Sequence, residues 1–213
     1  MKKQVYTLLL KLEGPMQSWG YRSRFDQRDT ALEPTRSGVI GLICAAMGIA
    51  REEDISQFES IRMGVRIDKK GRIERDYHTA LNVIKADGSG SDTVVSARDY
   101  LADASFTVGL QSDDKSLLEN IFYALCNPTW FLFLGRKAFP LSCPPVINPR
   151  EKCLKEGALE ETLLDGLSNK RIVLESSEGS RVQNDWPVCF HKRQFRPRHL
   201  RDCFDKERKR KNE

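Results

Sequence analysis

Hydrophobic and polar positions in the first third of the chain follow three different patterns. Residues 5–12 form an almost continuous apolar run, which predicts a buried strand. Residues 38–48 place apolar side chains at helical spacing, and Gly48 closes the predicted helix. Residues 61–67 alternate between apolar and polar side chains, which predicts a second strand. The chain therefore opens with a β-α-β unit.

A later stretch repeats this arrangement. Residues 104–110 predict a strand, and Asp113 and Asp114 supply a capping signal for a helix with a regular apolar stripe. Residues 130–134 predict the strand that completes the second unit. Two β-α-β halves around one sheet describe a domain of the α+β class with an RRM-like (ferredoxin-like) fold.

Turn-forming residues separate the two halves. The sequence Ala-Asp-Gly-Ser-Gly-Ser at residues 86–91 lies between short β-branched stretches, so we expect a protruding β-hairpin over about residues 79–99. Four prolines between residues 140 and 149 indicate a boundary. We therefore predict a domain over residues 1–140 that includes the hairpin, followed by a small C-terminal β-containing region with a basic tail over residues 141–213.

The net charge of +5 is unevenly distributed. Residues 192–213 contain ten Lys or Arg and four Asp or Glu, whereas residues 1–191 carry a net charge of −1. A basic terminal segment is typical of a nucleic-acid contact, although residues 206–211 could equally be a solvated tail.

The cysteine spacing and the N-terminal apolar run argue against a metal-binding protein, a disulfide scaffold and a membrane protein. The six cysteines include no C-x-x-C pair and no histidine at a ligand-like spacing, so we expect no metal site and no cofactor. Scattered cysteines favour a reducing, cytoplasmic compartment over a disulfide scaffold. Lys11 and Glu13 interrupt the first apolar run before it reaches membrane-spanning or secretory length, so we expect no membrane association.

The turn at residues 14–20 and the helix start at residues 33–38 together suggest an anion site. Free N–H groups at a helix N-terminus attract phosphate. Arg36 precedes this helix, and Arg22, Arg24 and Arg28 lie in the loop before it, so we expect an exposed Arg36 within a site for a polyanion. The structural alternative is that Ser37 is only an N-cap and that the helix glycines only allow close packing.

Five ordered blocks between residues 5 and 140 resemble the Cas five family of CRISPR-associated proteins, in its type I-E branch. They are residues 14–20 (GPMQSWG), 34–38 (PTRSG), 76–79 (DYHT), 100–108 (YLADASFTV) and 134–137 (LGRK). This resemblance implies a Cascade subunit that binds and caps the 5′ handle of the crRNA, with the hairpin as a thumb lying across the guide. The partners it implies are the crRNA 5′ handle, the Cascade backbone subunits and the large subunit, with target DNA reached only through the complex.

The resemblance also bears on catalysis. A relative in type I-C systems cleaves RNA without a metal through tyrosine, lysine and histidine, so residues 76–78 leave open an endoribonuclease that processes pre-crRNA. The type I-E branch leaves that step to a separate subunit, and we therefore expect no catalytic residues. A generic RRM-like RNA-binding module outside any CRISPR complex is the third alternative.

Candidate RNA-binding residues combine cations for phosphates with aromatic faces for unstacked bases. Trp19 and Tyr100 could instead be core aromatics, Gln17 could only cap the turn, and Arg136 could be an exposed strand-end charge. The predicted RNA-binding set is Met16, Gln17, Trp19, Arg22, Arg24, Arg36, Ser37, Tyr77, His78, Arg98, Tyr100, Arg136 and Lys137.

Overall fold

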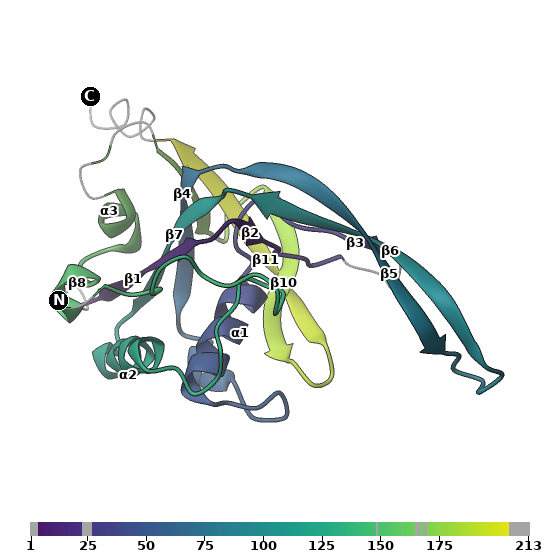
Figure 1. The fold of residues 1–213 in the computed structure, drawn as a ribbon. Coiled ribbons are helices and arrows are strands. Elements are labelled where there is room, and N and C mark those ends of the chain that lie inside the picture. The colour runs from purple at the N-terminus through teal and green to yellow at the C-terminus, as the bar shows by residue number, and fades with distance from the viewer. Residues whose placement is uncertain (1–3, 23–26, 148, 165–166, 168–169, 205–213) are drawn as a thin grey trace.

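The computed structural model describes residues 4–22, 27–147, 149–164, 167 and 170–204. Its main sheet has seven strands in the order β10-β11-β9-β4-β7-β1-β8 (Figure 1). The central strands are β4 (Arg62–Lys69), β7 (Ser105–Ser112) and β1 (Tyr6–Glu13), and all their pairings are antiparallel. These are the three strands that the sequence predicts at residues 5–12, 61–67 and 104–110.

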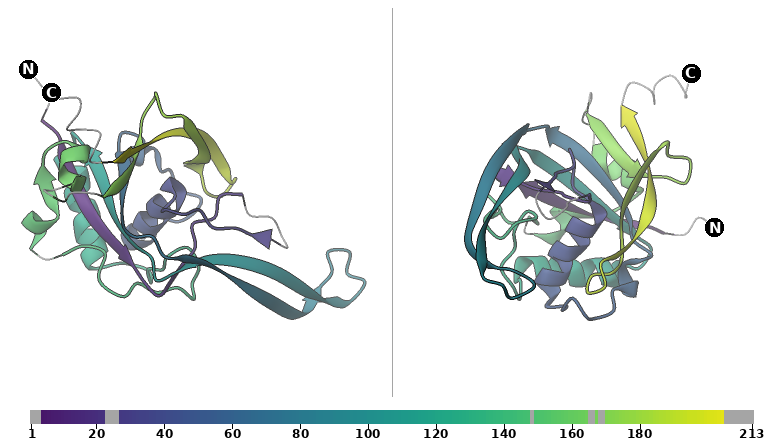
Figure 2. Two further views of the ribbon diagram at one scale, coloured as in Figure 1. Left: turned by 90° about the horizontal axis from the view of Figure 1, so that it is seen from above. Right: turned by 90° about the vertical axis from the view of Figure 1, so that its right-hand side faces the viewer.

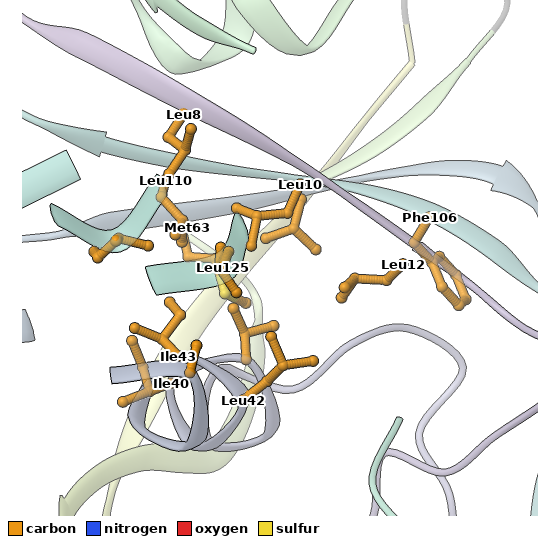
Figure 3. Close-up of a cluster of buried hydrophobic side chains, with 14 of the residues drawn as sticks. Leu8, Leu10, Leu12, Ile40, Leu42, Ile43, Met63, Phe106, Leu110 and Leu125 are labelled. Atoms are coloured by element: carbon orange, nitrogen blue, oxygen red, sulfur yellow. The ribbon is translucent and has the colours of Figure 1, made fainter. Parts of the chain in front are cut away.

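The hydrophobic core lies between this sheet and two helices. In β1, Leu8, Leu10 and Leu12 are fully buried, as the period of two in a strand requires when one face meets a core. Ile40 and Ile43 of α1 (Arg36–Met47) point toward them (Figure 3). The second helix, α2 (Lys115–Cys126), contacts β1 and β7 and buries its apolar stripe in the same core.

Both predicted helices are confirmed, together with one end of each. Gly48 ends α1 in the left-handed conformation (φ 75°), which a glycine adopts without steric cost. Asp114 begins α2, and its carboxylate accepts a hydrogen bond from the backbone N–H of Leu117 (3.1 Å).

The strand predicted at residues 130–134 is wrong. Only an isolated bridge between Phe133 and Pro140 forms there. The backbone N–H groups of Thr129 and Trp130 donate to Ala46 O (2.9 Å) and Ala45 O (3.1 Å), which lie in the last turn of α1 and have no partner within that helix. This segment is therefore docked on the end of α1, and β8 (Leu154–Glu156) pairs with β1 at the sheet edge instead.

A second sheet contains the long hairpin of β5 (Arg72–Ile84) and β6 (Ser91–Ala102), which projects from the body of the molecule (Figures 1 and 2). The hairpin begins before residue 79 and ends after residue 99, so it is longer than the segment predicted from the turn. Near its base, β6 also pairs with β2 (Met16–Gln17) and, in parallel, with β3 (Gln27–Arg28).

Every strand after residue 140 joins the main sheet at one of its edges. The strands β9 (Arg171–Glu175), β10 (Arg181–Cys189) and β11 (Gln194–Phe204) extend it beyond β4. Short 3₁₀ turns occupy Ser56–Phe58 and Arg150–Lys152. The basic stretch at 206–211 lies outside the described residues.

The helix α3 (Leu159–Leu164) covers the other face of the sheet. A Cβ atom on Gly64 or Gly109 would lie within 3 Å of the side chains of Leu159 or Leu163, so these two glycines let α3 approach the strands closely. Within the described part of the chain, no helix is long and apolar enough to span a membrane.

Candidate nucleic-acid interface

The start of α1 is closed to an external anion. Thr35, not Ser37, is the N-cap, and its hydroxyl accepts from the N–H of Gly38 (3.2 Å). The N–H of Arg36 donates to the carboxylate of Asp185 on β10 (2.7 Å). A carboxylate of the same chain therefore occupies the place where a phosphate was expected, and that expectation is wrong.

The expected exposure of Arg36 is also wrong, because the residue is only 1% exposed. Its Nη1 donates to Ile61 O (2.8 Å) and to the carboxylate of Glu175 (2.9 Å), and its Nη2 donates to Phe58 O (2.9 Å). The guanidinium also stacks on the ring of Trp186 at 3.6 Å. Arg36 thus joins α1 to the C-terminal strands, and these contacts leave it no free face for RNA.

Residues of the first turn are likewise internal. Trp19 is 1% exposed, and its Nε1 donates to Gln17 Oε1 (3.1 Å). Gln17 is fully buried and donates from Nε2 to Ala104 O (2.8 Å), which fastens the turn to the residue just before β7. For both residues the structural alternative holds, while Met16 and Ser37 are half-buried.

Three arginines meet at the base of the long hairpin. Arg28 on β3 and Arg98 on β6 are paired in register, so their side chains lie on the same face. Arg136 comes from the loop after α2, and its Nη2 donates to Asp99 O (2.8 Å) while its guanidinium lies 5.4 Å from the ring centre of Phe139. We call Arg28, Arg98 and Arg136 the arginine cluster.

The arginine cluster has carboxylates nearby but forms no ion pair with them among the described residues. Among the described residues, no carboxylate forms an ion pair with any of its three guanidiniums, since Asp99 pairs with Arg75 (2.7 Å) instead. Burial, followed by the charges of Arg98 and Arg28, lowers the pKa of Arg136 below its ordinary value, while Asp76 and Asp99 act in the opposite direction. Like charges held together in this way are stabilised when an anion binds between them.

Hydrogen bonds leave much of this cluster available. Arg98 uses Nε on a neutral acceptor, Ser96 Oγ (2.9 Å), and Arg136 uses one Nη2 donor on a backbone carbonyl. A guanidinium carries five donors in a fixed fork, so each of these two side chains is oriented by one bond and keeps others for a ligand. Such an arrangement can bind a phosphate through more than one donor.

Gly135 explains why Arg136 sits where it does. It has φ 89°, and a Cβ atom built on it would lie 1.7 Å from Ser18 O. The adjacent N–H of Ser18 donates to Leu134 O (3.0 Å), so the loop lies directly against the first turn. Only glycine fits this position, which gives a physical reason for the glycine in the Leu-Gly-Arg-Lys block at residues 134–137.

The remaining predicted residues are more dispersed. Tyr77 is 69% exposed on β5, and its neighbour His78 is exposed on the opposite face of the strand. Tyr100 is half-buried against Phe139 (ring centres 5.8 Å apart), so it is partly a core aromatic.

Two cations near the cluster are exposed. Arg22 lies over the ring of Tyr21 at 5.0 Å, and Lys137 follows Arg136 in its loop. Arg24 lies outside the described residues. Arg28 is absent from the predicted set because the sequence marks it only as one of several loop arginines, and its pairing with Arg98 joins distant parts of the chain.

The last feature of the site concerns possible metal ligands and cysteines in the part of the chain that the structure describes. No group of three or more histidine, cysteine, aspartate or glutamate side chains there could hold a metal ion. All six cysteines are free thiols.

The fold and this surface define a mixed α+β protein with large, mainly antiparallel sheets, few helices and a cationic cluster beside a long hairpin. Two solved structures share this architecture. One is described as "Crystal structure of Cas protein" (38% identity, TM-score 0.73, covering 92% of this chain and 93% of the other). The other is a chain of a "CRISPR RNA-guided surveillance complex" (33% identity, TM-score 0.75, covering 92% and 89%).

Sequence comparison agrees with these structures. A family model described as "CRISPR-associated protein (Cas_Cas5)" matches residues 7–201. The CRISPR system Cascade subunit CasD of Escherichia coli (strain K12) is 37% identical over 153 residues, which is 64% of this chain and 68% of that protein. The chain belongs to the Cas five family of CRISPR-associated proteins, as its sequence blocks predict.

Proposed function

We propose that this chain is a non-catalytic subunit of CRISPR Cascade that binds and caps the 5′ handle of the crRNA. The observation that carries this proposal is the arginine cluster, because three guanidiniums without paired carboxylates at one place suit a nucleic-acid backbone. The similarity to a Cascade subunit and to an RNA-guided surveillance complex supports the same ligand.

The order of the strands supports an RRM-like core. The four strands β1, β4, β7 and β8 lie in the order β8-β1-β7-β4, so the last of them in sequence, β8, is the neighbour of the first, β1. The helices α1 and α2 lie together on one face of these strands, as in a ferredoxin-like domain. Because β8 takes part, we infer that this core extends to Glu156 and does not end at residue 140. The hairpin of β5 and β6 would be the thumb.

The position of α3 argues against the usual RRM mode of binding. An RRM stacks bases on the open face of its sheet, but here Leu159 and Leu163 of α3 lie against Gly64 and Gly109 on that face. The RNA would therefore lie at the base of the hairpin, where Arg98, Arg136 and exposed side chains such as His78 and Lys137 are accessible.

The arrangement of Tyr77 and His78 favours binding over cleavage. A general base and a group that orients the attacking 2′-OH must converge on one phosphodiester. Neighbouring residues of an extended strand point to opposite faces, so these two side chains diverge. We therefore infer that guide processing is done elsewhere and that the endoribonuclease alternative is not favoured.

Partners follow from the assembled relatives. We infer that the chain assembles with Cascade backbone subunits and the large subunit, and that it contributes to target-DNA recognition only through the complex.

Binding of handle RNA over a series of salt concentrations tests this function. We compare the wild type with Arg28→Gln/Arg98→Gln, and use Lys115→Gln/Lys152→Gln, at the start of α2 and in the 3₁₀ turn before β8, as the charge-matched control. Each lost phosphate contact reduces the slope of log K against log salt by about 0.7 for a single strand. We expect the first variant to lose about 1.4 from the slope, and the control to lose none.

Equal affinities and slopes for all three proteins would remove the arginine cluster from the site. Cleavage of repeat RNA in EDTA by the wild type, abolished in His78→Ala, would replace the proposal with the endoribonuclease alternative.

A further inference from the structure

The turn between β10 and β11 forms a second cationic surface. Lys192 and Arg193 are exposed in this turn, and Arg51 is exposed beside it, after α1. Among the described residues none of the three forms an ion pair. We propose that this surface, called here the turn surface, binds a nucleic-acid backbone at a place distinct from the arginine cluster.

Arg193 adopts an unfavourable backbone conformation. Its φ is 51°, in the left-handed region where a Cβ atom crowds the following carbonyl. The other non-glycine residues with positive φ in the described chain are Asn82 and Asp103, whose short polar side chains tolerate this region. A glycine or asparagine would form the same turn at lower cost, so the turn retains an arginine at the expense of local stability.

The backbone beneath these charges is held in place. The N–H of Arg193 donates to Phe190 O (3.2 Å), and the N–H of His191 donates to Arg51 O (3.1 Å). The ring of Phe190 packs edge-on against Phe195 (6.5 Å between centres) and lies over Gly41 of α1. The turn is thus fixed to α1, and its cations are presented to a ligand with little backbone entropy to lose.

The carboxylates around the turn have local partners. Glu52 lies 3.6 Å from the ring of His191, and the carboxylate of Glu53 accepts from the N–H of Ala50 (2.6 Å). Further along β11, Arg196 is paired with Glu59 (2.7 Å). Arg51, Lys192 and Arg193 therefore keep no ion-pair partner among the described residues, and consecutive cations match the closely spaced phosphates of a nucleic-acid strand.

The turn surface and the arginine cluster are separate. In Figure 1 the β10–β11 turn lies beside α1, whereas β3 and β6, which carry Arg28 and Arg98, lie along the base of the β5–β6 hairpin. The inference rests on the proposed function only in taking a nucleic acid as the ligand. The phosphodiester backbone that fits here belongs to either the guide RNA or the target DNA, and two experimental arms separate these sources.

The test variant is Lys192→Ser/Arg193→Gly, compared with Lys115→Ser/Lys152→Ser as the charge-matched control. Glycine at 193 relieves the left-handed conformation, so the variant should unfold at the same urea concentration as the wild type or a higher one. The first arm measures the affinity of the isolated full chain for handle RNA. The second measures the affinity of assembled Cascade for a target DNA duplex.

Loss of two phosphate contacts weakens binding at about 0.15 M salt by about 14-fold for a single strand or about 30-fold for a duplex. A loss in the first arm assigns the turn surface to the guide RNA, and a loss in the second arm alone assigns it to target DNA. Unchanged affinity in both arms overturns the inference. Failure to assemble with protein subunits, with handle-RNA affinity intact, also overturns it and points to an acidic protein surface.

The two proposals fail in different ways. Handle-RNA affinity lost in Arg28→Gln/Arg98→Gln, with the turn variant unaffected in both arms, overturns this inference and leaves the proposed function standing. Affinity lost only in the turn variant keeps the inference and overturns the arginine cluster as the site. A wild-type chain that binds no handle RNA and forms no Cascade overturns both.

Discussion

Replacing Arg36 with alanine should damage the fold and not the RNA site. The side chain lies in a buried group with Glu175, Asp185 and Arg198, in which Glu175 receives hydrogen bonds from both arginines. Asp185 accepts two hydrogen bonds from Arg198 (2.8 and 2.6 Å) as well as the one from the backbone of Arg36. Alanine would keep the backbone bond and remove every contact of the guanidinium.

The size of the effect follows from these contacts. Truncation removes the side-chain donor of Ile61 O, at about 1–3 kcal/mol, whereas Phe58 O still accepts from the N–H of Ile61 (3.3 Å). Breaking a buried ion pair by removing one partner costs about 3–5 kcal/mol, and the lower half of that range applies because Glu175 keeps Arg198 at 3.1 Å. Since these terms overlap, we expect a loss of about 4 kcal/mol in the free energy of unfolding, or about 8–16 °C in Tm for a chain of this size.

Urea unfolding followed by circular dichroism measures this loss, with handle-RNA affinity determined on the same preparations. Arg98→Ala is the matched arginine variant, because the half-buried Arg98 has one side-chain contact from Nε, to the neutral hydroxyl of Ser96, and no ion pair among the described residues. It should change the unfolding free energy by less than about 1 kcal/mol and weaken RNA binding about fourfold. Wild-type stability for Arg36→Ala, together with weakened RNA binding, would refute this reasoning and return Arg36 to the site.

Three further outcomes are expected. Gly135→Ala should lower both stability and RNA affinity, because its Cβ would collide with a backbone oxygen at 1.7 Å; Gly88→Ala, also at positive φ but with nothing within 4 Å, should lower neither as much. Replacing residues 80–94 with an Asn-Gly turn should leave the urea midpoint unchanged, since these side chains are almost all exposed, but should reduce target binding by assembled Cascade. Burial acts to raise the pKa of Asp68, but hydrogen bonds led by that from Arg66 hold it below its ordinary value. The stability that the Asp68 carboxylate contributes is therefore present above about pH 4 and lost as pH falls through the lowered pKa. Asp68→Asn should reduce the pH dependence of the urea midpoint over that range.

Features decided by neighbouring residues were predictable from the sequence. The end of α1 at Gly48 and the start of α2 at Asp114 depend on local backbone chemistry, and both are as predicted. No strand forms at residues 130–134, because N–H groups at the start of this segment bond to the last carbonyls of α1 and not to a neighbouring strand. The hydrophobic periodicity of the sequence does not indicate which of these partners is used. An apolar run predicts burial, but it does not say which backbone will be its partner.

The candidate site shows the same limit more sharply. Arg36 and Glu175 are 139 positions apart in sequence, and Arg36 and Asp185 are 149 apart, so no local pattern could have predicted that this arginine is neutralised inside the protein. Arg28 and Arg98 are ordinary charges in the sequence and become a cluster only through the pairing of β3 with β6. Arg136 was predicted from the Leu-Gly-Arg-Lys block, and the glycine of that block is explained by the close approach of Ser18 O, another contact between distant parts of the chain.

The start of α1 donates to a carboxylate of the same chain, Asp185, and not to the external phosphate that the sequence predicted. The C-terminal strands that supply this carboxylate also contain much of the chain's basic excess, and part of that excess is consumed internally: Arg198 is buried against Asp185 and Glu175, and Arg196 is paired with Glu59. Counting charges along the sequence therefore overstates how much of this segment can bind nucleic acid, and it overlooks the base of the hairpin. A phosphate is attracted by guanidiniums that no carboxylate of the same chain has already neutralised. Which guanidiniums remain available depends on the ion pairs formed in the tertiary structure and not on net charge.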